Sequence, residues 1–452
     1  MLKSPLPTLS RKPIMNKALI GSITGLLVLG GAAVGGSLYA DQQLTDNAYS
    51  PELMQRSFGL ANFQAQTNLG ILSGSAQWQG DLVFDPCQPG DKITIRGNDT
   101  IHRSLSGYRI DSKIYIVSDS KQLNTYFPEG FLLNVRRHIG WGGNVQTSFN
   151  LPGRTIQKDG NTLTWQDING QVSLNKENNE LIPTEFQFSI PAIELKSGQT
   201  SFSLQNLSHR SQNSFLGHGK LQSGSSETTL AALTFISSPG NSIVFSQIKT
   251  TGTQSINGPA ASWGSAFNIQ RIDITQQGHR YDSNAGQSAG SKHSIEGLQL
   301  NSSFNGLNTQ AMQSFSDLIS RQRSVCIPRN EFKTKLSEIA TAMLNSGLSI
   351  QAQGNQIKLD GFPLTADAEL TLPPGQYGNI DNIRPETLVQ NLQYRADIRI
   401  HQGFIQAANH TFADWSNRIY NEEDTRQIIA KLLQLPEAKQ EGDTIRLIYR
   451  KP

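Results

Sequence analysis

Two short motifs have the spacing of serine nucleophiles. Gly286-Gln-Ser-Ala-Gly290 matches G-x-S-x-G, in which Ser288 would stand at a sharp turn between a strand and a helix. Ser118-Asp-Ser-Lys121 matches S-x-x-K, in which a helical turn brings the lysine amine to the serine hydroxyl. The first motif lies in a loop of small polar residues, and the second lacks the K-T-G and S-D-N motifs that accompany it in penicillin-binding proteins. We interpret both as surface turns.

The histidines do not form a metal-binding motif such as H-E-x-x-H. His209 and His218 lie on or near neighbouring predicted strands, but two ligands without a third make a weak metal site. The sequence also has no P-loop, no dinucleotide-binding glycine motif and no EF-hand loop. We therefore expect a non-enzymatic protein without a cofactor or a metal. The other histidines are His102, His138, His279, His293, His401 and His410.

The charge of the chain is unevenly distributed. Charged residues make up 17% of the 452 residues, against about 25% in typical domains. Residues 1–40 contain four basic residues and no acidic one, so the rest of the chain has 35 basic against 36 acidic residues, a net charge of −1. A near-neutral body lacks the field that attracts nucleic-acid phosphates. We expect no nucleic-acid partner.

Residues 18–40 form an uncharged run that is rich in apolar residues, preceded by Lys17 and followed by Asp41. About 20 such residues span a bilayer as a helix, and basic residues favour the cytoplasmic side. We predict a transmembrane anchor that leaves the body of the chain outside the cytoplasm. Through this helix, the membrane is an expected partner of the chain. A cleaved signal sequence is the alternative, because Ala40 suits the last position before cleavage although Leu38 fits poorly two residues earlier.

Cys87 and Cys326 are the two cysteines. They lie too far apart for a CxxC redox pair or a cysteine zinc site. In an oxidising compartment they could form one disulfide between an early loop and the region near Pro328. The sequence alone does not show whether they meet.

Apolar and polar residues alternate with period two over much of residues 93–305, which predicts half-buried strands. An example is Glu185–Ile190, where three apolar residues share one face. Turn residues such as those of Lys158–Asn161 separate the strands, and helical periodicity is absent between them, which favours antiparallel meanders. Ser, Gln, Asn and Thr occupy the polar faces, which accounts for the low charge.

The period changes after residue 305. Apolar residues at helical spacing predict helices over Asn308–Arg323, from Pro328 onward, and around Asn409–Leu435. Short strands separate and follow these helices. The fold class is therefore mainly β (α+β), with long antiparallel β-meander sheets, a few helices in the C-terminal third and one preceding transmembrane helix. We divide the chain into a cytoplasmic tail (1–17), the anchor (18–40), a β-rich periplasmic region (41–305) and an α+β region (306–452).

The order of these features resembles the YdgA-like family of bacterial envelope proteins, whose function is unknown. The resemblance is carried by the anchor, the strand pattern of Phe186–Leu195, the segment Phe202–Ser208, the entry Gly217–Leu221, and Leu298–Phe304 leading into a helix. An early His-Gly-Pro step and a terminal Asn-Gly turn, which members of the family tend to have, are missing here. The resemblance implies an inner-membrane protein with a periplasmic body, and it supplies no catalytic residues.

These observations predict an envelope protein that binds a partner or an apolar ligand, such as a lipid, through its large β-sheet body. A structural or assembly role, with self-association into a homo-oligomer or binding of another envelope protein, is the alternative.

Overall fold

The computed structural model describes most of the chain from residue 60 onward. The described residues are 49, 51, 60–69, 73–83, 85–88, 90, 92–104, 106–117, 127, 130, 131–140, 144–177, 180–213, 221–276, 291–383, 385–415 and 422–451.

Twenty strands among these residues form a single sheet. The first nine are β1 (Leu60–Leu69), β2 (Ser73–Val83), β3 (Lys92–Ser104), β4 (Gly107–Val117), β5 (Phe131–Gly140), β6 (Val145–Leu151), β7 (Arg154–Lys158), β8 (Asn161–Trp165) and β9 (Ile168–Glu177). Six long strands form the middle: β10 (Glu180–Ser197), β11 (Thr200–Gln212), β12 (Gly224–Ser238), β13 (Asn241–Asn257), β14 (Ala260–Gln276) and β15 (Ser291–Asn308). The last five are β16 (Leu348–Leu359), β17 (Phe362–Leu372), β18 (Gln393–His401), β19 (Ala438–Glu441) and β20 (Thr444–Lys451).

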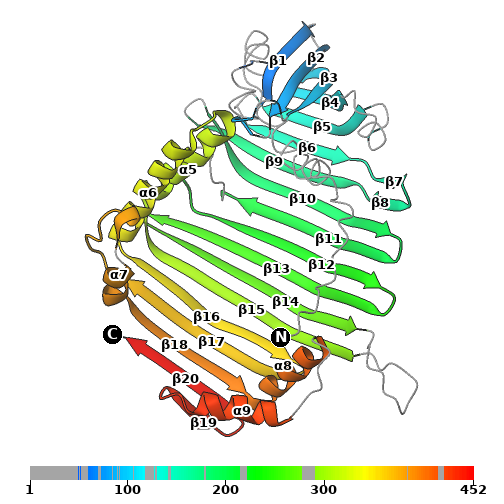
Figure 1. Cartoon of the computed structure of the whole chain (residues 1–452). Helices are drawn as coiled ribbons and strands as arrows, with labels where there is room; N and C mark the ends of the chain where they lie inside the picture. The colour runs from blue at the N-terminus through cyan, green and yellow to red at the C-terminus, as the bar shows by residue number, and fades with distance from the viewer. Residues whose placement is uncertain are drawn as a thin grey trace.

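The strands cross the sheet almost in chain order, and every pair is antiparallel (Figure 1). Three departures from chain order occur. β6 pairs with β9, and the β7–β8 hairpin pairs with the second half of β10. At the far end β20 lies between β18 and the short edge strand β19. The sheet runs past residue 305 without a break, because β15 pairs with β16.

The helices whose bounds the structure describes follow β15. They are α5 (Thr309–Ser324), α6 (Arg329–Asn345), α7 (Pro385–Asn391), α8 (Gln402–Trp415) and α9 (Glu422–Leu433), with a short 3₁₀ helix, η2 (Ile380–Asn382). The Asn308 side chain caps α5 by accepting a hydrogen bond from the Ala311 amide at 2.9 Å. The two predicted helices that follow residue 305 are confirmed with nearly the predicted bounds, whereas α8 begins seven residues before the predicted start at Asn409.

The coarse fold prediction is confirmed: the protein is mainly β, with a large antiparallel sheet and few helices. Tight turns suit this architecture, since Asp159-Gly160 and Asp360-Gly361 each have two consecutive positive φ angles, as type I′ hairpins require. The predicted transmembrane segment 18–40 lies outside the described residues. Within the described ranges, none of the helices is both long enough and apolar enough for a membrane span.

The largest buried cluster fills the N-terminal part of the sheet, where β1–β9 contribute most of its side chains. An ion pair lies inside it: Arg137 Nη2 donates to Asp99 Oδ2 at 3.0 Å, and both side chains are almost fully buried. Tyr49 Oη and Trp78 Nε1 also donate to the Asp99 carboxylate, at 2.7 and 3.2 Å. Burial and the neighbouring Asp99 charge raise the pKa of Tyr49, so its hydroxyl stays a donor. These donors compensate the desolvation of the carboxylate.

In each of the six long strands β10–β15, one additional residue interrupts the pairing, and these residues lie side by side across the sheet. At this level each strand has one residue without a partner in the register: Ile190 pairs with Leu207 and Ala192 with Gln205, and this gap recurs from strand to strand. The backbone has positive φ at three of these positions, on alternate strands. We call this row the bulge line; its residues are Pro191, Asn206, Ala231, Gln247, Gln270 and Gly297.

The bulge line shifts the alternation of side chains by one residue. On β10 the apolar residues are Phe186, Phe188 and Ile190 before the line, but Ile193 and Leu195 after it. All five belong to, or pack against, the same buried cluster, so they lie on one face of the sheet. An extra residue in a strand re-aims the side chains that follow it. The bulge line therefore keeps one face apolar along the whole length of the strand.

Cys87 and Cys326 form a disulfide in the structure, with their Cα atoms 4.7 Å apart. Cys87 lies in the β2–β3 loop, and Cys326 lies between α5 and α6. The bond therefore ties the N-terminal part of the sheet to the α5–α6 pair, across 239 residues of sequence.

Replacing both cysteines with serine should lower the free energy of unfolding by about 2–5 kcal/mol, because a crosslink over so long a loop restricts the unfolded chain strongly. Urea titration of the oxidised wild type and the double variant measures this difference. The wild type in reductant should match the variant, whereas reductant should leave the variant unchanged. Equal stability of all four samples would contradict the disulfide.

Gly297→Ala should destabilise the protein by about 1 kcal/mol, because φ is +57° at this position of the bulge line and an alanine there is strained. A Cβ atom at Gly297 would meet nothing within 4 Å, so the backbone alone causes the loss. Asn206→Gly is the matched control, since glycine adopts the same conformation without strain. A Gly297→Ala variant that is as stable as the wild type by urea denaturation would show that the bulge line relaxes at this strand.

Candidate functional site

Three consecutive rows of side chains cross β10–β15 on the face that the bulge line keeps apolar. Every member is aliphatic or phenylalanine except one histidine. We call these rows the apolar floor. The first is Ile190, Leu207, Leu230, Ile248, Ile269 and Leu298; the second is Ile193, Leu204, Leu233, Phe245, Ile272 and Ile295; the third is Leu195, Phe202, Phe235, Ile243, Ile274 and His293.

The middle of the apolar floor is partly accessible to solvent. Phe235 is 41% exposed, and Leu230, Leu233 and Phe245 are half-buried. The phenylalanines contact one another across strands, with ring centroids 5.1 Å apart for Phe202 and Phe235. Monomeric proteins rarely expose a contiguous apolar area of this kind unless it binds something. This makes the apolar floor the leading candidate for a binding surface.

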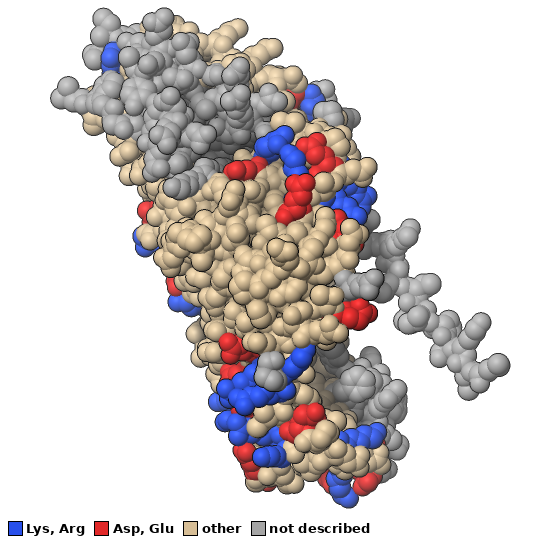
Figure 2. Space-filling view, turned by 90° about the vertical axis from the view of Figure 1, so that its left-hand side faces the viewer, with Lys and Arg blue, Asp and Glu red and all other residues tan. Residues whose placement is uncertain are grey.

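The charged side chains of the long strands lie on the opposite face. From Glu185 to Leu298, every Lys, Arg, Asp and Glu described on β10–β15 alternates along its strand with the residues of the floor face. They form ion pairs there, as in Lys249–Glu227 (2.6 Å) and Arg271–Asp273 (2.7 Å). The apolar floor thus has no formally charged Lys, Arg, Asp or Glu among the described residues. Viewed from the left-hand side of Figure 1, where α5, α6 and α7 lie, the surface also shows a broad area without such side chains between two charged regions (Figure 2).

Described elements border the apolar floor on three sides (Figure 1). The N-terminal cluster packs against its first two strands, through residues such as Ile193 and Leu204. The α5–α6 pair packs at one end of the strands, where Met312 and Met343 join a cluster with Ala261. At the other margin α8 packs against β16–β18. Within the part of the chain that the structure describes, the helices therefore make their main contacts at the borders of the floor.

Two further rows on the same face separate the apolar floor from α5–α6, and hydroxyl groups and small residues are concentrated in them. We call them the hydroxyl strip. The row next to the floor is Phe188, His209, Thr228, Thr250, Phe267 and Leu300, and the outer row is Phe186, Ser211, Ser226, Gly252, Ser265 and Ser302.

His209 is the titratable group of the hydroxyl strip. Its ring stacks on Phe188, with centroids 5.4 Å apart, and its Nδ1 shares a hydrogen bond of 2.8 Å with Thr228 Oγ1. Burial lowers the pKa of His209 below its ordinary value of 6.5, because desolvation disfavours the charged ring. The strip is therefore uncharged at neutral pH.

His293 lies where the apolar floor meets α8, in contact with an acid and a hydroxyl. Its Nδ1 is 3.2 Å from Thr411 Oγ1 and 3.4 Å from Asp360 Oδ2, and the His410 ring lies at 5.7 Å. A catalytic triad needs the acid and the nucleophile on opposite ring nitrogens. Here both contacts fall on one nitrogen, and the Thr411 hydroxyl donates to the Ala407 carbonyl. The cluster fastens α8 to the β15–β16 region.

The residues predicted to carry chemistry are not brought together. Ser118, Lys121, Ser288, His218 and His279 lie outside the described residues. His209 and His293 lie on the floor side of the long strands, His102 and His138 lie on β3 and β5, and His401 stacks on Phe362. No cluster of three or more metal-ligating side chains occurs among the residues that the structure describes.

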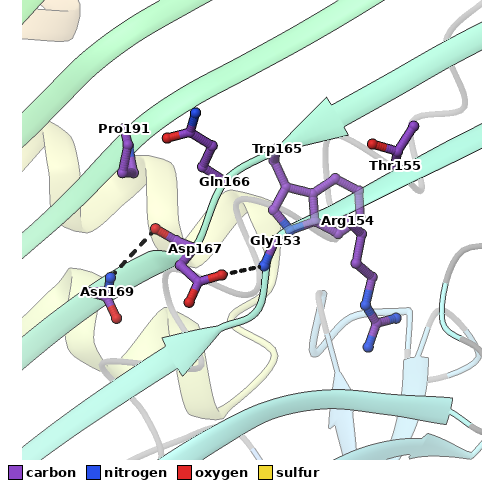
Figure 3. Close-up of a pocket in the computed structure, with 8 residues that line it drawn as sticks. All are labelled: Gly153, Arg154, Thr155, Trp165, Gln166, Asp167, Asn169 and Pro191. Atoms are coloured by element: carbon purple, nitrogen blue, oxygen red, sulfur yellow. Dashed lines mark hydrogen bonds between the residues drawn. The ribbon is translucent and has the colours of Figure 1, made fainter.

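A surface hollow of about 620 Å³ lies beside Pro191, at the bulge line (Figure 3). Its polar groups already bind one another: the Gly153 amide donates to Asp167 Oδ1 at 2.7 Å, and Trp165 Nε1 donates to the Pro152 carbonyl at 2.9 Å. These bonds hold the bend where β6 leads into β7 and β8 into β9. We interpret the hollow as a structural joint.

The sequence pattern predicts period-two alternation on single strands but not the apolar floor as a unit, because it does not reveal the slip of one residue in each strand. Pro191 inside a strand was the signal, because proline in a sheet is confined to edges, strand starts and bulges.

One family model matches the chain. It is described as a bacterial protein of unknown function (DUF945), and it covers residues 118–435. No curated protein and no solved structure matches the chain. The match confirms the predicted membership of an uncharacterised bacterial family. It covers β5–β18 and both ends of the apolar floor.

Proposed function

We propose that this chain, which belongs to the DUF945 family of bacterial proteins of unknown function, is a membrane-anchored periplasmic protein that binds an apolar ligand or partner on its apolar floor. The resemblance to YdgA-like envelope proteins is part of the proposal. The partly accessible, uncharged rows around Phe235 on β12 and β13 carry it.

The sequence supports the location. The basic residues before residue 18 and the apolar run that follows fit an anchor with its N-terminus in the cytoplasm. A disulfide between Cys87 and Cys326 suits the oxidising periplasm. The body then lies next to the membrane that supplies apolar ligands.

The chemistry of the floor supports binding without catalysis. A ligand on these rows makes dispersion contacts and displaces water. Each Å² of apolar area that it covers contributes roughly 25 cal/mol of favourable free energy. A reaction needs a positioned nucleophile, acid or base, and His293 is engaged in fastening α8. The function is therefore to bind or transport the apolar ligand without changing it chemically.

A structural or assembly role is the second candidate, and the sheet edges favour it. Among the described residues, β1 and the short strand β19 are the last strands at opposite ends of the sheet, each paired on one side. Unpaired strand edges can add a strand from another copy or partner.

Leu233→Lys should abolish binding of an uncharged apolar fluorophore such as N-phenylnaphthylamine, because it places a charge in the second row of the floor. Fluorescence titration of purified protein should show at least a tenfold loss of affinity. Thr234→Lys is the matched control, since the next residue on β12 points to the opposite face. Equal binding by the wild type and both variants would count against the floor. Thermal unfolding of both variants checks that the sheet is intact.

Alkaline phosphatase fused after residue 452 should be active in a bacterial host, and the fusion should stay in the membrane fraction after alkaline carbonate washing. The phosphatase needs an oxidising compartment, so its activity reports the periplasm. Deletion of residues 1–40 should abolish the activity. Release of a shortened, active fusion into the soluble periplasmic fraction would instead support a cleaved signal sequence.

A further inference from the structure

We propose that the occupant of the apolar floor is an ester-linked or hydroxyl-bearing lipid, whose acyl chains lie along the strands and whose uncharged polar group meets the hydroxyl strip. This inference rests on the proposed function and names the class of its ligand. It follows from the size of the floor, the order of its rows and the absence of charge.

The length of the floor matches an acyl chain. From Leu195 in the third row to Ile190 in the first, the strand advances five residues, or about 17 Å at 3.3 Å per residue. One leaflet of a bilayer has about half of a 30 Å hydrocarbon core. The six strands, about 4.8 Å apart, make the floor about 24 Å wide. The N-terminal cluster packs against β10 and β11, and Ile269 and Ile272 on β14 are buried, so the acyl chains would lie over β12 and β13, where Phe235 is exposed.

The rows change polarity in the order that a lipid does. Along β12, Phe235, Leu233 and Leu230 belong to the apolar floor, and Thr228 and Ser226 follow in the hydroxyl strip. Along β13 the same direction leads from Ile243 to Thr250. A lipid changes from hydrocarbon to ester or hydroxyl at the corresponding distance.

His209 and Thr228 can serve such a polar group whichever ring nitrogen carries the proton. Nδ1 is held by Thr228, and Nε2 has no hydrogen-bond partner among the described residues. Nε2 therefore donates to an ester carbonyl in one tautomer and accepts from a hydroxyl in the other. Gly252 accommodates the neighbouring Ser226 hydroxyl, because a Cβ atom there would approach Ser226 Oγ to 2.7 Å.

The lack of charge selects among ligands. A free fatty acid would bring a carboxylate to a strip without a cationic partner, which costs far more than burying an ester. An extended peptide would bury backbone N–H and C=O groups against side chains of a sheet face, where backbone donors and acceptors are already paired within the sheet. An ester or hydroxyl lipid has neither penalty. An apolar helix also satisfies its own backbone, so it serves as the rival occupant in the test.

The test uses full-length protein in detergent and three probes: a fluorescent dipalmitoylglycerol, fluorescent palmitate at pH 8, and N-phenylnaphthylamine. The wild type should bind the diacylglycerol at least tenfold more tightly than palmitate. Thr228→Val with Ser226→Ala removes two hydroxyl groups and keeps the shapes of the side chains. This double substitution should weaken diacylglycerol binding about tenfold, because each lost hydroxyl removes the free energy of one hydrogen bond. The affinity for N-phenylnaphthylamine should stay the same.

Thr229→Val is the matched control on the opposite face of β12, where Thr229 Oγ1 contacts Ser208 Oγ at 2.7 Å. It should leave all three affinities unchanged. Leu233→Lys should weaken the binding of both the diacylglycerol and N-phenylnaphthylamine.

The outcomes separate the two proposals. Binding of N-phenylnaphthylamine without preference for diacylglycerol, or without an effect of the hydroxyl substitutions, would overturn the lipid assignment and leave the floor as a binding surface. Displacement of that fluorophore by an apolar helical peptide but not by diacylglycerol would overturn the lipid assignment in favour of a protein partner. Failure of the wild type to bind any probe would overturn the proposed function as well.

Discussion

The constraint on which the structure depends is that every long strand inserts one extra residue at the same level. A strand has a strict period of two, so the apolar residues Ile190 and Ile193 could not share a face on an uninterrupted strand. A bulge in one strand alone would break its pairing with the next. In β10–β15 the extra residue recurs opposite its neighbour, so the register on both sides of the bulge line is preserved.

The segregation of charge follows from that constraint. Because the bulge line keeps the apolar positions together, the ion pairs of Arg210–Glu185 and Arg271–Glu296 are brought onto the other face, on both sides of the line. The two faces of the sheet therefore differ in the interactions that they make. The charged face carries ion pairs, and the apolar face joins the N-terminal cluster at one border and the helix clusters at the others.

The sequence predicted the local elements better than their assembly. The Asp159-Gly160 turn, the helix beginning near Asn308 and the alternation around Phe186 all result from interactions between residues close in sequence, which a pattern reveals. The meeting of Cys87 with Cys326 depends on contacts across 239 residues, which no local pattern contains. The apolar floor is of the same kind. Each strand shows only a shift of one residue in its alternation. The continuous apolar rows become visible only when the six strands are aligned in their register.

An incompletely covered sheet of this length is stable because its stability is distributed among neighbouring strands. Each long strand contacts mainly the strand before it and the strand after it, as in repeat proteins, so the middle of the sheet does not need a second layer to keep its register. The deeply buried cluster lies under β1–β9, and the helices add smaller clusters at the other borders. The rows between them contribute less burial to folding than a closed core would. An occupant that covers the accessible part of these rows, around Phe235, therefore adds burial beyond that given by the described residues, and its binding energy comes from the same apolar contacts that elsewhere hold the fold together.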